Sequence, residues 1–225
     1  MIVSKDFIAA FKDYFFLMNK SYPDKGSVKF VGDRYGLSGS DRSMLYRGVH
    51  AEPQNAIRRK KLISESGFSG QPLHIDSFNV LLSIISYLEG KPVYLSTDGL
   101  LRDASEWHGN SLKPVSVKQT LDILFDYLKE KKGFGHLNFY IDQPLRESAR
   151  VLEMISEKIE DLGLEGSANR FSYSDDMLQL IRDGYLATSD SRIIDRSSQP
   201  VFDLAKAVLE YKFNPRFFDL KKIIS

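Results

Sequence analysis

Four aspartates follow apolar runs that are typical of buried β-strands. Asp76 follows Leu-His-Ile, Asp98 follows Val-Tyr-Leu-Ser-Thr, Asp142 follows Leu-Asn-Phe-Tyr-Ile, and Asp190 follows Tyr-Leu-Ala-Thr-Ser. In an open parallel sheet, ligands bind in the crevice beyond the carboxyl ends of the strands. We therefore expect these carboxylates, although far apart in the sequence, to gather at one edge of the sheet.

Crowded carboxylates repel one another and raise each other's pKa, so a fold keeps such a cluster mainly where cations bind. The chain has no cysteine, and an oxygen-rich ligand set favours Mg²⁺ or Mn²⁺ over Zn²⁺. Two such ions about 3.5–4 Å apart can clamp a phosphodiester, activate water and stabilise the leaving oxygen. An aspartate after a strand is also often an Asx turn or a helix N-cap. Each position alone therefore favours a structural role, and only the set favours a metal site.

Further acids lie near the last of these strands. Asp175 and Asp176 open a short expected helix just ahead of that strand, and Asp195 follows Asp190 closely. Asn79 lies shortly after Asp76 and could orient that carboxylate or a phosphate. These residues extend the candidate site without changing its chemistry.

The elements that must position these acids alternate from residue 73 onward. Expected strands lie at 73–76, 91–99, 137–144 and 185–190, and amphipathic or apolar helices separate them. Strands joined by helices of this length need crossover connections, which predicts a parallel sheet covered on both faces. The fold class expected from residue 71 to 225 is therefore α/β.

The first part of the chain, residues 1–68, is predicted to be helical. Phe7, Phe11 and Met18 recur at helix spacing, with Ser4 as the expected N-cap, and Ser40 is expected to cap a later helix. Glycines and a proline at 67–72 indicate a boundary. We expect a helical N-terminal region at 1–68 and a separate α/β domain at 71–225.

Composition excludes some classes of function and leaves others open. The 225 residues include 31 basic and 30 acidic side chains, so the net charge of +1 argues neither for nor against nucleic acid. Without cysteine there is no disulfide framework and no thiolate chemistry. Charged residues interrupt the apolar start of the chain, which is neither a signal peptide nor a membrane span. We expect a cytoplasmic protein that does not enter a membrane.

Two segments carry cations that could contact phosphate. The first is the run Arg58, Arg59, Lys60 and Lys61, for which a solvated helix face is the alternative. The second is the acid-rich stretch "STDGLLRDASEWHGN", in which Arg102 and His108 could contact phosphate and Trp107 could stack on a base. A surface loop whose tryptophan packs on a helix is the alternative for this second segment.

Four motifs, "IDSFN", "FYIDQP", "YSDDMLQLI" and "LATSDSRII", occur in that order. Together they resemble the PIN-like nuclease superfamily, especially its branch with an Asp-x-x-Asn first motif. The resemblance implies a Rossmann-like three-layer sandwich and magnesium- or manganese-dependent cleavage of RNA. It assigns the motifs to the following residues: Asp76 and Asn79, then Asp142, then Asp176 (or Asp175), then Asp190, with Thr188 and Ser189 beside the metal site.

The chain departs from the PIN-like pattern in one respect and resembles a second family over nearly its whole length. The glutamate that many PIN-like nucleases use has no clear counterpart, and Asp98 and Asp103 are the candidates to replace it. The second resemblance is to an uncharacterised prokaryotic family in which a helical part, with a stretch like "VGDRYGLSGSDRSMLYRGV", precedes a PIN-like part. That resemblance implies no activity.

Three functions remain open from the sequence. The first is a Mg²⁺- or Mn²⁺-dependent phosphodiesterase acting on RNA. The second is a non-catalytic module that binds nucleic acid or protein and in which the acids are turn residues. The third is a metal-dependent phosphatase acting on a small phosphorylated molecule, over which the "STDGLLRD" segment would close.

Overall fold

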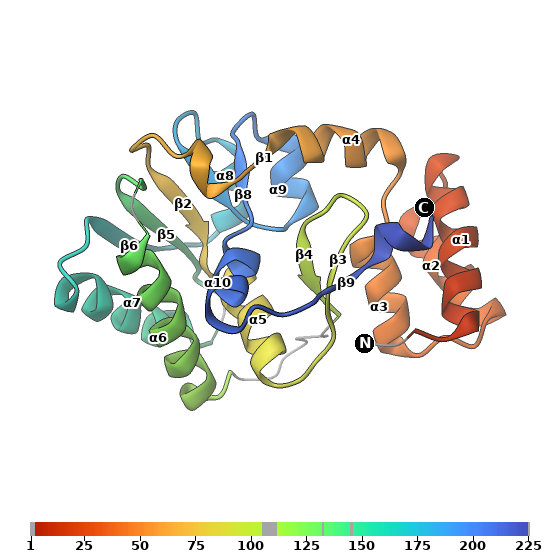
Figure 1. The fold of residues 1–225 in the computed structure, drawn as a ribbon, viewed down its shortest axis with the longest axis horizontal. Helices are drawn as coiled ribbons and strands as arrows, with labels where there is room; N and C mark the ends of the chain where they lie inside the picture. The colour runs from red at the N-terminus through yellow and green to blue at the C-terminus, as the bar shows by residue number, and fades with distance from the viewer. Residues whose placement is uncertain (1–2, 105–111, 132, 145, 225) are drawn as a thin grey trace. The chain divides into compact units, whose positions relative to one another are not determined.

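A computed structural model describes residues 3–104, 112–131, 133–144 and 146–224. The chain divides into two compact units (Figure 1). The first unit combines Met1–Lys60, Glu89–His108 and Arg216–Ser225, and the second combines Lys61–Leu88 and Gly109–Pro215. Each unit is described by itself below.

The second unit is built on a parallel β-sheet. In the described part of the chain this sheet has six strands in the order β1-β8-β7-β2-β5-β6, and every pairing is parallel. The strands are β1 (Leu62–Ile63), β2 (Leu73–Asp76), β5 (Leu137–Asp142), β6 (Gly166–Phe171), β7 (Tyr185–Ala187) and β8 (Val201–Phe202). The helices are α5 (Ser77–Leu88), α6 (Pro114–Glu130), α7 (Ser148–Asp161), α8 (Ser174–Gln179), α9 (Ser191–Arg196) and α10 (Leu204–Phe213). The predicted α/β class with a parallel central sheet is confirmed.

The two faces of the sheet can be followed along β5. Its residues alternate between buried and half-buried, as expected for a strand whose two faces differ. Phe139 stacks on Phe125 of α6 with ring centroids 5.6 Å apart, so the buried residues of β5 face α6. Asp142, on the opposite face, accepts a hydrogen bond from Ser174 of α8. Helices therefore flank both faces, with α6 on one and α8 on the other.

Strand β6 was not predicted from the sequence. Its residues, Gly-Ser-Ala-Asn-Arg-Phe, contain no apolar run, and none of them is buried. Because β6 is an edge strand of the sheet, it pairs through its backbone on one side and has little need of apolar side chains. Strands β1 and β8 were not predicted either, because two residues are too few to show the alternating pattern of a strand.

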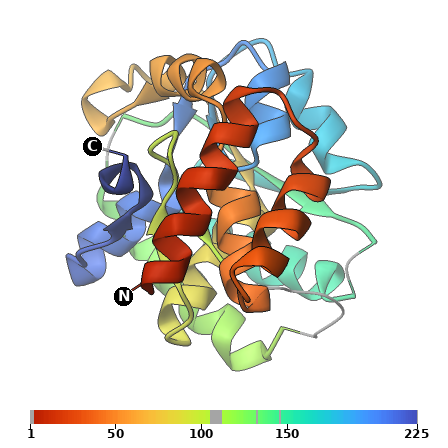
Figure 2. The same cartoon turned by 90° about the vertical axis from the view of Figure 1, so that its right-hand side faces the viewer.

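The first unit contains an N-terminal helical region of about 60 residues. Its helices are α1 (Lys5–Asn19), α2 (Asp24–Arg34), α3 (Gly39–Gly48) and α4 (Glu52–Lys61). Figure 2 shows α1 packed beside α2, and both α1 and α2 also contact α3. Phe7, Phe11 and Met18 are buried along one side of α1, as predicted from their spacing. Ser4 caps α1 as expected, whereas α3 is capped by Ser38 and not by Ser40.

A small sheet in the first unit corrects one prediction. Strand β3 (Val93–Leu95) pairs antiparallel with β4 (Leu101–Asp103) and parallel with β9 (Phe218–Asp219). The segment expected to be a second strand of the central sheet thus belongs to another sheet. Residues 89–104 and 216–224 pack with the helical region, so the first unit is not one continuous stretch of chain.

No helix in the described ranges is both long enough and apolar enough to cross a bilayer.

Candidate carboxylate site

Asp76 lies at the centre of the candidate site, at the carboxyl end of β2. It is buried, and its Oδ2 accepts a hydrogen bond from Thr188 Oγ1 at 2.8 Å. Thr188 Oγ1 in turn accepts a hydrogen bond from the backbone N–H of Asp190 at 3.1 Å. Strands β2 and β7 are paired neighbours, so their ends bring these residues together across more than a hundred positions of sequence.

Asn79 holds the same loop from the first turn of α5. Its Oδ1 accepts hydrogen bonds from the backbone N–H of Ser189 at 2.8 Å and from the Ser189 hydroxyl at 3.0 Å. Both donors engage the side-chain oxygen that could otherwise bind a cation. Asn79 therefore fixes the Thr188–Asp190 segment, which differs from the expected role of orienting Asp76 or a phosphate.

The carboxylates act on one another through their charges. Burial raises the pKa of Asp76 to about 7, the Thr188 hydrogen bond opposes this, and the charges of Asp175, Asp190 and Asp142 raise it further. Burial also raises the pKa of Asp175, with added contributions from Asp190 and Asp142. The predicted convergence of Asp76, Asp142 and Asp190 at one edge of the sheet is therefore present in the structure.

Each carboxylate around Asp76 has its own partners. Asp142 accepts a hydrogen bond from Ser174, the first residue of α8. Asp190 is the N-cap of α9 and accepts from the backbone N–H of Arg192 at 2.7 Å. The guanidinium of Arg192 lies 3.6 Å from Asp190 and 3.8 Å from Asp175. Arg192 thus places a positive charge beside two of the acids.

Two of the predicted acids are peripheral in this arrangement. Asp176 is exposed, and its charge contributes to raising the pKa of Asp175. Asp195 is also exposed, in the last part of α9. We therefore place Asp175, and not Asp176, beside Asp76, Asp142 and Asp190.

The carboxylate oxygens of this site are the type of ligand that a hard cation such as Mg²⁺ prefers. An aspartate whose pKa is raised first by burial and then by neighbouring acids gains from a cation that neutralises the charge. As they stand, no three acidic or histidine side chains in the described ranges are arranged so that they could hold one ion together. Ser174 and Arg192 engage Asp142, Asp175 and Asp190 in this arrangement.

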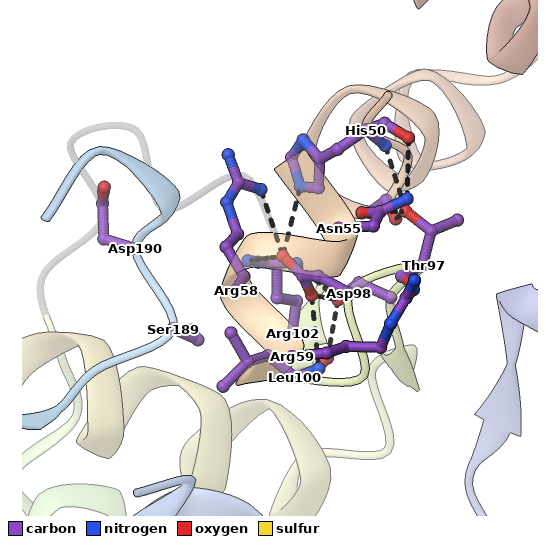
Figure 3. Close-up of polar contacts among 12 residues, drawn as sticks. His50, Asn55, Arg58, Arg59, Thr97, Asp98, Leu100, Arg102, Ser189 and Asp190 are labelled. Carbon is purple, nitrogen blue, oxygen red and sulfur yellow. Dashed lines mark hydrogen bonds and ion pairs between the residues drawn. The ribbon is translucent and has the colours of Figure 1, made fainter. Parts of the chain in front are cut away.

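Asp98 belongs to a different cluster, in the first unit, and is withdrawn from the candidate site. It is fully buried, and Figure 3 shows Arg58 and Arg102 converging on its carboxylate. Arg102 makes two hydrogen bonds of 2.8 Å to the two Asp98 oxygens, and Arg58 makes one of 3.1 Å. Burial by itself would raise the pKa of Asp98, but the Arg102 charge and hydrogen bonds hold it well below its ordinary range. Asp98 is a buried ion-pair partner and is not available to a metal.

The same cluster accounts for other predicted residues. Asp103 is buried and lies 3.5 Å from the guanidinium of Arg47. Arg102 is buried on Asp98, so it cannot reach a phosphate as predicted. Burial lowers the pKa of His50 to about 3, with a further contribution from the Arg102 charge. His108 and Trp107 lie outside the described residues.

The basic run is mostly committed to protein partners. Arg58 is buried on Asp98, and Arg59 donates to the Thr97 carbonyl at 2.9 Å. Lys61 donates to the carbonyls of Ile194 and Ser197, both at 2.6 Å. Lys60 is exposed. The run is therefore neither the predicted phosphate contact nor the solvated face that was its alternative, except at Lys60.

Sequence reasoning missed Ser174 and Arg192. Ser174 precedes the Asp175–Asp176 pair in the motif "YSDDMLQLI", and Arg192 follows Asp190 in "LATSDSRII". Both lie inside motifs that were recognised for their acids alone. The usable signal was their position in the first turns of α8 and α9, whose N-termini meet the ends of the strands.

Two family models and one relative together match almost the whole chain. A family model described as "Domain of unknown function (DUF5616)" matches residues 65–207, and one described as "Protein of unknown function (DUF434)" matches residues 6–61. The uncharacterized protein MJ0935 of Methanocaldococcus jannaschii is 28% identical over 205 residues, which cover 89% of this chain and 95% of the relative. No solved structure matches the chain.

Proposed function

We propose, from the premise that the chain belongs to the DUF5616 family, that it is a divalent-cation-dependent phosphodiesterase acting on RNA. The proposal includes a relationship of the second unit to PIN-like nucleases, which rests on the order of its four acidic motifs. The observation that carries it is the gathering of Asp76, Asp142 and Asp190 at and just beyond the carboxyl ends of three neighbouring parallel strands. Burial, and then the charges of Asp175, Asp190 and Asp142, raise the pKa of Asp76 there. A fold tolerates that electrostatic cost when the acids serve a cation.

The cation would be Mg²⁺ or Mn²⁺, held by Asp76 with Asp142, Asp175 and Asp190. When bound, it would neutralise these charges and polarise a phosphate ester. Thr188 fixes one oxygen of Asp76 by its hydrogen bond, and Asn79 fixes the backbone that carries Asp190. These two residues keep the acids in position, so we assign them positioning roles.

Arg192 adds a positive charge that matches the negative charge of a substrate phosphate. Its guanidinium lies within 4 Å of Asp175 and Asp190 and its side chain is largely exposed. A guanidinium pairs with phosphate through two parallel hydrogen bonds. With a cation held by the acids, Arg192 would be placed to pair with a phosphate of the substrate.

The test is a cleavage assay with the full chain and Mn²⁺ on RNAs of varied sequence. We expect turnover by the unmodified protein and a loss of at least 100-fold in Asp76→Asn, because the variant removes the central charge. Asp161→Asn, which changes an exposed acid at the end of α7, is the matched control and keeps its activity.

A metal titration followed by thermal melting separates the alternatives. Binding to the native state raises the melting temperature by mass action, so the unmodified protein is expected to be stabilised by millimolar Mn²⁺ and Asp76→Asn is not. RNA binding without a metal effect and without turnover would instead identify a non-catalytic module. The phosphatase alternative is tested with a panel of nucleotides and sugar phosphates. Its "STDGLLRD" segment does not favour it, because Asp98 and Arg102 are buried in an ion pair.

A further inference from the structure

A small pocket lies between the first turns of α6 and α7, two helices that pack side by side (Figure 1). Its volume is about 210 Å³, below the roughly 300–1,000 Å³ of sites that enclose a drug-sized ligand, so it fits a single chemical group. Phe139 of β5 stacks on α6, whereas Asp142 of the same strand bonds to α8. The pocket and the carboxylates therefore lie on opposite faces of the sheet.

The lining of the pocket combines apolar and charged side chains. Leu112, Val117 and Val151 are buried apolar residues of its wall. Arg146 and Arg150 are exposed residues that also line it, and neither forms an ion pair within the described ranges. Because water screens a charge less beside buried apolar groups, each arginine would attract an anion here more strongly than on an open surface.

The charges at the start of α7 are opposite to those that stabilise a helix. The N-terminus of a helix carries a partial positive charge, so acids are favourable there and cations are not. Arg150 nevertheless lies in the first turn of α7, which contains no acid, and Arg146 lies just ahead of that turn. Glu147, the N-cap, also lines the pocket, but its side chain caps no backbone N–H group of the helix. The two arginines are therefore not explained by the stability of α7.

Arg170 of β6 brings a third cation to the same place. It donates to the Gln143 carbonyl at 3.5 Å, and Ser148, the first residue of α7, donates to that carbonyl at 3.1 Å. The three arginines thus outnumber Glu147 at the start of α7. This excess of positive charge is unfavourable at a helix N-terminus unless an anion offsets it.

The backbone beside the pocket adds hydrogen-bond donors. The first N–H groups of a helix have no carbonyl partner inside that helix. In α6 and α7 the N-cap side chains, those of Lys113 and Glu147, do not accept from them. An anion between the two helix ends would be favoured by both helix dipoles. These donors strengthen a site that the pocket and its arginines define.

We propose that this pocket binds a phosphate group, held by Arg146 and Arg150. A guanidinium pairs with phosphate through two parallel hydrogen bonds, and the double charge of a phosphate monoester matches two such cations. The apolar residues of the wall would contact the organic part of a small phosphorylated molecule. Because the charges of the pocket itself select the anion, this site does not depend on the proposed function.

Isothermal titration calorimetry and thermal melting of the full chain, in EDTA, test the site. The probes are inorganic phosphate and uridine 5′-monophosphate, and the controls are uridine and sodium chloride at equal ionic strength. The unmodified protein is expected to bind at least one phosphate probe and to melt at a higher temperature with it, by mass action. Neither control is expected to have this effect.

Arg146→Gln and Arg150→Gln are each expected to weaken binding roughly tenfold or more, because each variant loses a bidentate pair. Lys129→Gln changes an exposed cation in the last turn of α6 and is the matched control, which should bind like the unmodified protein. Without phosphate, the arginine variants should melt no lower than the unmodified protein, since each removes a cation from a helix N-terminus. A lower melting temperature would show that the arginines serve the fold and would contradict the inference.

The inference is overturned if neither phosphate probe binds, or if both arginine variants bind as tightly as the unmodified protein. Tighter binding of the nucleotide than of inorganic phosphate would identify a phosphorylated molecule as the ligand, and equal binding would identify phosphate itself. Asp76→Asn is expected to bind the probes normally. Phosphate binding without metal-supported turnover would therefore retain this site and reject the phosphodiesterase.

Discussion

At the scale of single residues, Asp76 shows how a site can be kept at a cost in stability. Its carboxylate is buried at the end of β2 and accepts a hydrogen bond from Thr188. Three other acids act on it through their charges. A residue chosen only for stability would not carry a negative charge there, because an uncompensated buried charge destabilises the folded state.

The stability that Asp76→Asn gains over the unmodified protein is expected to depend on pH. An unfolded aspartate ionises near pH 4, while folding raises the pKa of Asp76 to about 7. The folded protein therefore loses stability as pH rises from about 4 to about 7, and the whole penalty is present above that range. Asparagine has no such penalty, so the variant is expected to be more stable by about 2–4 kcal/mol at pH 8.

Urea unfolding at pH 5 and at pH 8, without divalent cations, measures this difference. The advantage of the variant should be clearly smaller at pH 5, where most of the Asp76 population is protonated in the folded protein. Asp161→Asn serves again as the control and should show no such trend. An equal effect at both pH values would mean that Asp76 does not titrate in this range.

Local sequence identified Asp76, Asp142 and Asp190 but could not separate them from Asp98. "KPVYLSTD" and "LNFYID" both read as an apolar strand that ends on an acid. Their difference lies in which strands they pair with, since β3 pairs with β4 and β9 while β5 joins the central sheet. The hydrophobic period of a strand does not determine which distant strand it pairs with.

At the scale of elements, the short helix α9 shows how a loop that carries a site is fixed at both ends. Asp190 caps its start by accepting from two backbone N–H groups. Lys61 closes its end by donating to the carbonyls of Ile194 and Ser197. A two-turn helix has little stability of its own, so these contacts decide whether α9 forms and where Asp190 lies.

Lys61→Met is expected to destabilise α9 by about 1–3 kcal/mol, because two charge-assisted hydrogen bonds are lost while the apolar stem is kept. Amide hydrogen exchange at residues 191–197 measures the effect, which should appear as faster exchange. Lys60→Met is the matched control, since Lys60 is the exposed neighbour. Similar exchange in both variants would show that the Lys61 contacts do not stabilise the helix.

Helices were easier than strands to predict from this sequence. Long helices such as α1, α6 and α7 were expected from their apolar spacing, and the structure has them. Strand β6 escaped notice because an edge strand with half-exposed side chains has no apolar signature. The stacking of Phe171 on Tyr140 therefore could not be expected from the sequence, since Phe171 meets Tyr140 only through the pairing of β6 with β5.

At the scale of the whole molecule, the first unit is assembled from three separate stretches of chain. Tyr94 of β3 and Leu220, near the C-terminus, are both fully buried in one core with Phe7 and Leu45 of the helical region. Gly48 permits this packing, because a Cβ there would lie 2.5 Å from the Tyr94 ring and 2.7 Å from Leu220. A linear division at residues 68–71 therefore describes the sequence but not this core.

Leu220→Ala is expected to destabilise the first unit by about 2–5 kcal/mol, through lost burial and the cavity left behind. Denaturant unfolding, followed by the fluorescence of the intact chain, measures this loss. Ile224→Ala is the control, because Ile224 is 38% exposed and its truncation should cost little. A small effect of Leu220→Ala would mean that the last residues are not part of the core.

The core that joins Phe7 to Leu220 has a consequence for protein synthesis. A ribosome makes the chain from the N-terminus, so the first helices emerge long before the residues that complete their packing. Until the last segment has left the exit tunnel, the core that these helices form with one another lacks the part that Leu220 contributes. The first unit can therefore complete this core only after Leu220 has left the ribosome, and chaperones that shield exposed apolar surface would act during that interval.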